Sequence, residues 1–231
     1  MILDRRSLLA SLAATPFADQ APYRREQRLF ADDFRRGLDQ WVIEAEKPAT
    51  AQARDGVLEI IAPGGLTAWF KPELIGPAAI TYQAQAVSAG GPYDRVSDLN
   101  AFWMAREVDG GSPLDHPRSG AFADYDTLKT YYVGHGGNSN TTTRFRRYVG
   151  RPGERPLLPQ HDHAAPEEML TPNRWVSVRL VADGRRIEYW SDGRRLFDLD
   201  DPAPYPRGWF GLRTTQSHLR IRDFAVFRLA L

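Results

Sequence analysis

Residues 175–199 read Trp-Val-Ser-Val-Arg-Leu-Val-Ala-Asp-Gly-Arg-Arg-Ile-Glu-Tyr-Trp-Ser-Asp-Gly-Arg-Arg-Leu-Phe-Asp-Leu, and this stretch decides the fold class. Residues 175–181, 186–190 and 195–199 combine alternating side chains with β-branched and aromatic residues, which predicts three strands. Asp183-Gly184 and Asp192-Gly193 lie between them, and Asp-Gly is a preferred pair for tight hairpin turns. The segment therefore predicts two consecutive antiparallel hairpins.

The same signals extend in both directions along the chain. Further strands are predicted at 29–34, 56–62, 68–70, 79–87, 100–105, 131–134, 141–148, 208–213 and 219–228. Pro63-Gly64-Gly65 is expected to separate the strand at 56–62 from the strand at 68–70. Residues 109–126 and 150–172 lack periodicity and are expected to be long loops, which often carry function. About a dozen strands without a convincing amphipathic helix predict an all-β fold, a two-sheet antiparallel β-sandwich or jelly roll.

Composition limits the classes of function. The 231 residues carry a formal net charge of +1, with 30 basic and 29 acidic side chains interspersed, which argues against a nucleic-acid binder that depends on phosphate attraction. There is no cysteine, so disulfides, thiolate metal sites and a cysteine nucleophile are excluded. The length suits one domain whose stability comes from packing.

The N-terminal sequence resembles an export signal. Arg5-Arg6 precede a short apolar run and small residues up to Ala18, a pattern typical of twin-arginine signals. The run is too short to span a bilayer, so no stable membrane insertion is expected. We expect residues 1–18 to be the signal, residues 19–231 to form the jelly-roll domain, and the protein to be periplasmic or secreted. The alternative is an N-terminal amphipathic helix of the mature fold.

The strongest functional signal lies in residues 131–148, Tyr-Tyr-Val-Gly-His-Gly-Gly-Asn-Ser-Asn-Thr-Thr-Thr-Arg-Phe-Arg-Arg-Tyr. The simplest local structure is a strand, a glycine-rich loop and a second strand. Tyrosine, histidine and arginine together supply a proton donor, a group that titrates near neutrality and a fork for a carboxylate. This density of hydrogen-bonding side chains favours a ligand or catalytic site. The alternative is a polar hairpin whose asparagines bond their own backbone and whose arginines are solvated.

Strand alternation divides these side chains between two faces. Val133 has the character of a core residue, so Tyr131 should share the core face and Tyr132 should face a cleft. By the same rule Phe145 should enter the core, while Arg144 and Arg146 share the other face with Tyr148. Both arginines could equally form a solvated outer face with salt bridges.

The residue types offer two candidate metal sites. His161-Asp162-His163 offers two imidazoles and a carboxylate that could bind zinc if His116 or Asp126 converged on them. Calcium could be held by Asp32, Asp33 and Asp223 in a structural role. Neither pattern is specific, so no metal or other cofactor is expected.

The strand sequences at 175–180, 187–193, 208–214 and 221–227 are similar to those of concanavalin-like lectin and glucanase jelly rolls. Residues 131–148 look like the signature of the domain-of-unknown-function family 6250. The resemblance covers nearly the whole mature chain and implies a jelly-roll fold, with a polysaccharide or oligosaccharide as partner. It leaves the reaction open.

Within that group the residues favour some chemistries over others. Retaining glycosidases of this fold carry a Glu-x-Asp-x-x-Glu strand, which this chain lacks, and Glu59 and Glu188 are expected to face solvent. A polysaccharide lyase that eliminates across a uronate needs a carboxylate binder, a base and an acid. Tyr132, His135 and Arg146 are the predicted catalytic residues, and Tyr or His would act as acid or base.

The remaining candidates would bind the sugar. The predicted substrate-binding residues are Asn100, Trp103, Asn138, Asn140, Arg144 and Gln216. Trp69, Trp103 and Trp209 could stack on sugar rings or pack in the core, and His218 and Lys129 are weaker candidates. The alternatives to a lyase are a carbohydrate-binding module without catalysis and a structural domain without a ligand.

Overall fold

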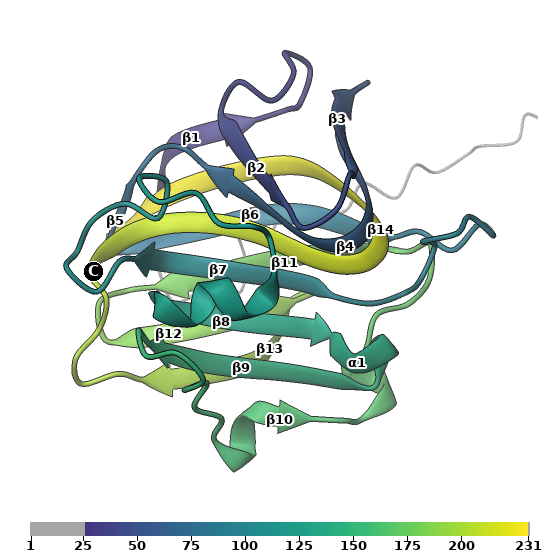
Figure 1. Ribbon diagram of the computed structural model, residues 1–231. Helices are drawn as coiled ribbons and strands as arrows, with labels where there is room; N and C mark the ends of the chain where they lie inside the picture. Colours follow the sequence, from purple (N-terminus) through teal and green to yellow (C-terminus); the bar gives the residue numbers. More distant parts are fainter. Residues whose placement is uncertain (1–25, 231) are drawn as a thin grey trace, which may run out of the picture.

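The structure is a computed structural model that describes residues 26–230. Its strands are β1 (Glu26–Asp32), β2 (Trp41–Ala45), β3 (Thr50–Arg54), β4 (Val57–Phe70), β5 (Leu74–Ile75), β6 (Ala78–Ala86), β7 (Leu99–Arg106), β8 (Lys129–Gly136), β9 (Thr142–Val149), β10 (Asp162–His163), β11 (Trp175–Ala182), β12 (Arg186–Ser191), β13 (Arg194–Asp200) and β14 (Arg207–Leu229). Four short helices connect them: η2 (Phe122–Thr127), α1 (Gly137–Asn140), η3 (Pro159–His161) and η4 (Pro166–Glu168). The predicted all-β class is confirmed (Figure 1).

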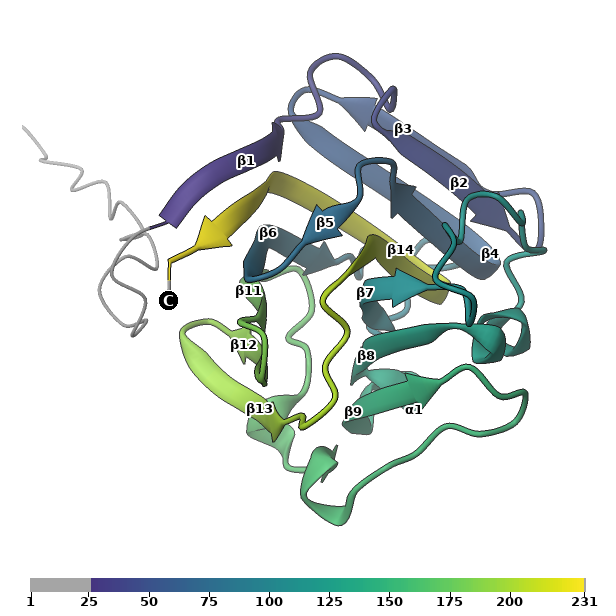
Figure 2. The ribbon, with the colours of Figure 1, turned by 90° about the vertical axis from the view of Figure 1, so that its left-hand side faces the viewer.

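The strands pair antiparallel and form two layers. Layer A contains β2, the second half of β4, the first half of β14, and then β7, β8, β9 and β10. Layer B contains β3, the first half of β4, the second half of β14, and then β6, β11, β12 and β13, with β1 beside β14. β14 belongs to both layers because it doubles back at its middle (Figures 1 and 2).

β14 turns from one layer to the other at a bulge in its pairing with β4. The bulge lies inside continuous strands, so the predicted strand boundaries need correction. The register between β4 and β14 shifts between Thr215 and Ser217, opposite Gly65 and Ala62. Gln216 has a φ of 45° there, and Pro63 lies on the facing strand, where a bulge leaves a residue without a ladder bond. Residues 56–62 and 68–70 are therefore parts of one strand, β4, and residues 208–213 and 219–228 are parts of β14.

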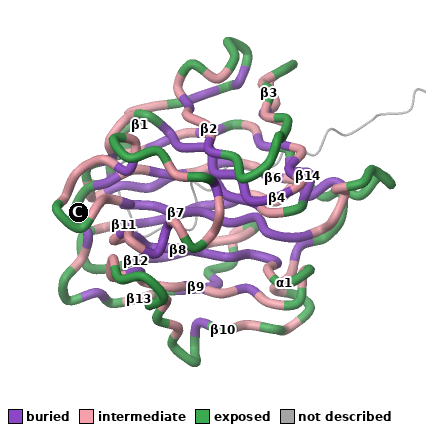
Figure 3. The backbone as a smooth tube through the Cα atoms, viewed as in Figure 1, coloured by how far each residue is buried: buried purple, intermediate pink, exposed green. Residues whose placement is uncertain are grey.

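The main core fills the space between the layers. It contains the aromatic cluster of Phe34, Trp41, Phe70, Phe210 and Phe224, whose ring centroids lie 4.8–6.3 Å apart in the pairs that touch. Figure 3 shows the buried positions concentrated in the strands and the exposed ones in the connecting loops. Burial of aromatic side chains at this density is the main source of stability in a chain without disulfides.

The connections between strands contain the two long irregular segments that the sequence predicts. Residues 107–128 carry η2, and residues 150–174 carry η3, η4 and the two-residue strand β10. No helix in residues 26–230 is long and apolar enough to cross a membrane. The predicted export signal, residues 1–18, lies outside the described residues.

Candidate functional site

Strand β8 places Tyr131 and Tyr132 on opposite faces of layer A, as its alternation predicts. Tyr131 and Val133 belong to the main core between the layers. Tyr132 belongs to a separate aromatic cluster on the outer face of layer A, together with Trp69, Phe102, Tyr125 and Tyr148. Phe145 of β9 enters the main core, which leaves Arg144 and Arg146 on the outer face with Tyr148.

Cross-strand register aligns the outer face into two rows. One row runs across the sheet through Trp69, Gly211, Phe102, Tyr132 and Arg146. The adjacent row runs through Thr67, Arg213, Asn100, Gly134, Arg144 and Asp162. We call the polar group at their centre the Tyr132 site, which consists of Asp98, Asn100, Tyr132, Arg144, Arg146 and Arg213.

Gly134 lets a phenol and an amide lie beside each other at this site. A Cβ at position 134 would stand 3.1 Å from the Tyr132 hydroxyl and 3.5 Å from Oδ1 of Asn100. The tyrosine ring is fixed by Phe102, Phe122 and Tyr148, with ring centroids 5.1–5.5 Å away. Because no side chain fills the position of Gly134, both polar groups share the space above the strand.

The Tyr132 hydroxyl is a proton donor at neutral pH. Burial raises the pKa of Tyr132 well above its usual value, and nearby Tyr148 and Asp98 raise it further. The charges of Arg213 and Arg146 act in the opposite direction. The phenol therefore stays protonated and can donate a hydrogen bond or a proton.

Asn100 presents an acceptor at the same place. The residue is only 4% exposed, and its Nδ2 lies 3.4 Å from Oδ1 of Asp98. Its Oδ1 has no hydrogen-bond partner among residues 26–230. Asp98 is held in turn by Arg95, whose Nη2 donates at 2.9 Å. Buried amide oxygens are normally paired, so this enclosed and unpaired oxygen beside Gly134 indicates a place for a ligand group.

Three guanidinium groups flank the phenol and the amide. Arg144 forms a bidentate pair with Asp162 at 2.7 and 3.2 Å and keeps 30% of its side chain exposed. Arg146 donates to the main-chain carbonyl of Arg155. Arg213 is buried and donates to Thr67 Oγ1 at 3.0 Å and to the Gly120 carbonyl at 2.9 Å. The exposed pair, Arg144 with Asp162, is the part of the row that an incoming ligand can reach.

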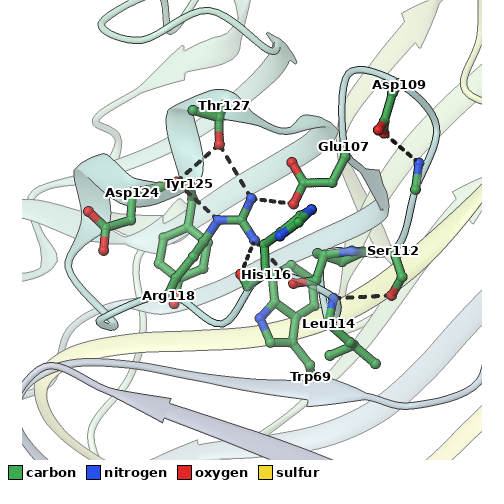
Figure 4. A network of polar contacts seen from close by, with 12 residues as sticks. Trp69, Glu107, Asp109, Ser112, Leu114, His116, Arg118, Asp124, Tyr125 and Thr127 are labelled. Carbon is green, nitrogen blue, oxygen red and sulfur yellow. Dashed lines mark hydrogen bonds and ion pairs between the residues drawn. The ribbon is translucent and has the colours of Figure 1, made fainter.

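The loop 107–128 forms a fixed wall beside the site. Glu44 accepts hydrogen bonds from Trp69 Nε1 at 2.9 Å, from the Tyr125 hydroxyl at 2.8 Å and from the Arg118 main-chain N–H at 2.8 Å. The Arg118 guanidinium bonds Glu107, Thr127 and main-chain carbonyls of the same loop (Figure 4). The wall packs on the aromatic half of the outer face.

His135 does not join the Tyr132 site, so its predicted place beside Tyr132 is wrong. It follows Gly134 on β8 and therefore faces the main core. Its Nδ1 is 2.8 Å from the Tyr189 hydroxyl, and its ring also bonds the Glu168 main chain. Burial lowers the pKa of His135 from 6.5 to about 4. A buried neutral imidazole on the far side of the sheet cannot exchange protons with a ligand above Tyr132.

Three of the predicted sugar-binding residues are also elsewhere. Trp103 is buried in the main core against Tyr131 and Phe145. Asn138 lies in the exposed hairpin end and donates to Thr142 Oγ1. Asn140 forms two hydrogen bonds of 2.9 Å with the main chain of Leu170. Trp103 thus has a packing role, and the two asparagines stabilise the α1 turn and its contact with the next loop.

The remaining candidates are spread over other parts of the chain. Gln216 is exposed on β14, opposite the bulge that Pro63 and Gly64 form in β4. His218 bridges Asp94 at 2.7 Å and Glu59 at 3.0 Å. Lys129 donates to the Val108 carbonyl. Trp69 is buried in the outer aromatic cluster, while Trp209 packs at its edge and donates to the Lys71 carbonyl. None of these five side chains belongs to the Tyr132 site as defined here.

The candidate carboxylates and metal ligands do not form a centre in the described residues. Glu188 was expected to face solvent but is buried, and it accepts from Trp190 Nε1 and Arg195. His161 bonds the Asp198 carbonyl, whereas Asp162 pairs with Arg144. Residues 26–230 contain no group of three or more histidine, aspartate or glutamate side chains that could hold a metal ion.

Two residues of the site, Arg213 and Asp98, were not predicted from the sequence. Arg213 lies within the apolar strand segment Gly208–Arg213, and Asp98 lies in the loop before β7. A charged residue at an outward position of a mostly apolar central strand was the available signal for Arg213. Asp98 gave no local signal, because its position beside Asn100 depends on the path of the loop.

Comparison with known families gives one match. The model of a domain of unknown function, DUF6250, matches residues 60–224. A comparison with curated proteins finds no match.

Solved structures share the fold at low sequence identity. A Bacillus subtilis protein of unknown function with a galectin-like fold has a TM-score of 0.69 and 14% identity, covering 89% of this chain and 99% of that one. A structure reported for the endo-acting O-glycanases of the human gut microbiota has a TM-score of 0.56 and 10% identity, covering 87% and 98%. The exoplasmic/lumenal domain of VIP36, bound to Ca²⁺ and mannose, has a TM-score of 0.55 and 11% identity, covering 83% and 84%. These similarities place the chain among galectin-like and concanavalin-like β-sandwiches.

Proposed function

The chain belongs to the family of the domain of unknown function DUF6250, and we propose that it binds a carbohydrate with carboxylate groups at the Tyr132 site. The galectin-like fold and the carbohydrate ligands or substrates of structural neighbours support a carbohydrate as the ligand class. Arg144, the arginine of the site that a ligand can reach, supports an acidic sugar, because guanidinium groups bind carboxylates through charge-assisted hydrogen bonds.

The buried and unpaired Oδ1 of Asn100, close to the Tyr132 hydroxyl, is the observation that carries the proposal. A sugar hydroxyl can donate to the amide oxygen and accept from the phenol. Such a ligand would satisfy a buried acceptor that is otherwise unpaired, which is favourable by about 1–3 kcal/mol. Arg144 lies in the same row as Asn100, two strands away, and can contact a carboxylate on the same or the next sugar unit.

Cleavage by β-elimination is the second candidate, favoured by the protonated state of Tyr132. In this reaction a base removes the C5 proton of a uronate, the bond from C4 to the leaving oxygen breaks, and that oxygen takes up a proton. Tyr132 fits the proton donor, and Arg144 and Arg146 fit the groups that stabilise the charge on the carboxylate. Asp98 is the carboxylate in the site that could accept the C5 proton. His135 takes no part, because it faces the core.

Calorimetric titration and an absorbance assay separate the two candidates. The protein is titrated with oligomers of galacturonate, mannuronate and glucuronate, and with neutral cello-oligosaccharides as the control. Heat of binding to a uronate oligomer without a gain in ultraviolet absorbance supports a binding protein. A gain in absorbance from unsaturated products supports a lyase. Equal or tighter binding of the neutral oligomers would contradict the preference for an acidic sugar.

We also propose that the protein is exported through the twin-arginine route. The support is the sequence Arg5-Arg6 followed by Ser7-Leu8-Leu9 and small residues. Replacing Arg5 and Arg6 by lysine should leave the protein in the cytoplasm of the host, as measured by cell fractionation. Unchanged export of that variant would contradict the proposed route.

A further inference from the structure

A cavity lies at one end of the sandwich, on the other side of layer A from the Tyr132 hydroxyl. It has a volume of about 390 Å³ and lies between the segment Pro166–Thr171, the start of β11 and the turn between β12 and β13. We call it the end cavity. Its volume falls within the range of small-molecule sites, about 300–1,000 Å³.

The lining of the end cavity combines aliphatic side chains with polar and charged ones. Leu170, Val176 and Leu196 contribute aliphatic surface, and His135 contributes its ring. Both polar ends of His135 are engaged, by the Tyr189 hydroxyl and by the Glu168 main chain. Burial keeps the pKa of His135 at about 4, so this ring adds no charge to the cavity at neutral pH.

Ion pairs surround the opening. Arg174 pairs with Asp192 at 2.5 Å, and Arg194 pairs with Glu168 at 3.2 Å. The side chains of Arg174 and Arg194 are 60% and 54% exposed. With Glu167, the lining carries two cations and three carboxylates. This balance disfavours an anionic ligand, while each pair offers a donor beside an acceptor, which suits neighbouring hydroxyl groups.

The wall formed by Pro166–Thr171 is held in place before any ligand binds. Asn140 bonds both the N–H and the carbonyl of Leu170 at 2.9 Å. Thr143 Oγ1 donates to the Glu168 carbonyl at 2.8 Å. A wall fixed by three hydrogen bonds from the β8–β9 hairpin lowers the conformational cost of binding.

We propose that the end cavity binds a neutral sugar unit, with its C–H face against Leu170, Val176 and Leu196. Its hydroxyl groups would then contact the Arg174–Asp192 and Arg194–Glu168 pairs. This site is separate from the Tyr132 site and takes a different class of sugar, so it does not depend on the proposed function.

Amide chemical shifts of the ¹⁵N-labelled protein test the proposal. D-Glucose, D-galactose and D-mannose are titrated separately, with D-galacturonate as the charged comparison. The expected result is a saturable shift of amides in residues 168–171 and 191–196 by at least one neutral sugar, with a dissociation constant on the order of 1 mM. Arg194→Ala should weaken this binding by about fivefold or more, since it removes one donor of an opening pair. Ser191→Phe should abolish it by filling the opening.

Arg195→Ala is the matched control, because Arg195 is the next residue and pairs with Glu188 instead. It should leave the dissociation constant unchanged, and thermal melting should show that all three variants are folded. The proposal is overturned if no neutral sugar shifts these amides, if galacturonate binds there more tightly, or if Arg194→Ala and Arg195→Ala have equal effects. Binding of uronate oligomers is followed separately, through the amide shifts of Asn100 and Arg144. The result for one site therefore leaves the proposal for the other site unaffected.

Discussion

Neighbouring residues on one strand have different environments in this protein, and Gly134 and His135 show the reason. Alternation from Tyr131 predicted correctly that Tyr132 faces outward and that Arg144 and Arg146 share its side. The same rule would have sent His135 into the core, but the glycines around it predicted a loop. The strand continues to Gly136 and pairs His135 with Leu99, so alternation still applies at that position.

The buried His135 makes the stability of the protein depend on pH. Its pKa in the folded state is about 4, below the value of 6.5 expected for the unfolded chain. Between these values the unfolded state binds the extra proton, so the free energy of unfolding falls as pH decreases from 6.5 towards 4. At pH 5 the loss from this group should be about 2 kcal/mol relative to pH 7, at about 1.4 kcal/mol for each pH unit.

Urea unfolding of the wild type and of His135→Gln at pH 7 and pH 5 measures this contribution. The variant should be less stable at pH 7 but should lose about 2 kcal/mol less on acidification. His116→Gln, which changes an exposed histidine, should retain the full pH dependence of the wild type. Identical pH dependence of the wild type and His135→Gln would contradict a buried neutral imidazole.

Tyr132→Phe tests the role of the phenol. The variant keeps the ring contacts with Phe102 and Tyr148, so its melting temperature should stay close to that of the wild type. It should weaken binding of a uronate oligomer by about tenfold, because one hydrogen bond of about 1 kcal/mol or slightly more is lost. If the protein is a lyase, the turnover number should fall by about a hundredfold or more. Unchanged affinity and turnover would exclude the hydroxyl from the site.

At the scale of elements, the loop 107–128 depends on one buried carboxylate. Glu44 accepts from Trp69, Tyr125 and the main chain of Arg118. Glu44→Gln replaces one carboxylate oxygen by an NH₂ group, which would point at N–H or O–H groups that also donate. We therefore expect the free energy of unfolding to fall by about 2 kcal/mol. Hydrogen exchange should increase within residues 107–128 and much less elsewhere. Glu154→Gln, at an exposed carboxylate, is the control and should change neither quantity.

The two asparagines of the α1 turn provide a matched pair of variants. Both have positive φ, 52° at Asn138 and 63° at Asn140, so replacement by alanine introduces similar backbone strain. Only Asn140 bonds Leu170. Asn140→Ala should therefore destabilise the protein by about 1–2 kcal/mol more than Asn138→Ala in urea unfolding. Equal effects would show that the contact with Leu170 adds no stability.

Elements with strict alternation were predictable from sequence, whereas those shaped by long-range contact were not. The β11–β12–β13 hairpins were predicted because their Asp-Gly turns are local signals. The continuity of β4 through Pro63-Gly64-Gly65 could not be predicted, because it depends on pairing with the distant strand β14, where Pro63 and Gly64 together lie opposite Gln216. β3, Thr-Ala-Gln-Ala-Arg, lacks strong strand composition, and it forms because it pairs with β4. β2 carries the strand formers Trp41, Val42 and Ile43, but the run is short and it also pairs with β4.

At the scale of the whole molecule, polar residues that alternate along the β8–β9 hairpin lie at two different places in the sandwich. Tyr132, Asn100 and Arg144 meet on the outer face of layer A because β7, β8 and β9 pair in register. His135 and Asn140, from the same hairpin, contribute to the end cavity and its wall. The family and fold class followed from sequence patterns, while this division between sites followed only from the direction of each side chain in the paired sheet.

The central claim is that the outer face of layer A binds an acidic carbohydrate, and mapping of amide chemical shifts with a uronate oligomer tests it most directly. We expect saturable shifts at Asn100, Tyr132, Gly134 and Arg144. Affinity should fall about tenfold or more in Arg144→Ala and stay unchanged in Arg151→Ala, where the arginine is exposed and distant in register. Shifts confined to layer B or to the end cavity, or equal affinities of the two arginine variants, would contradict it.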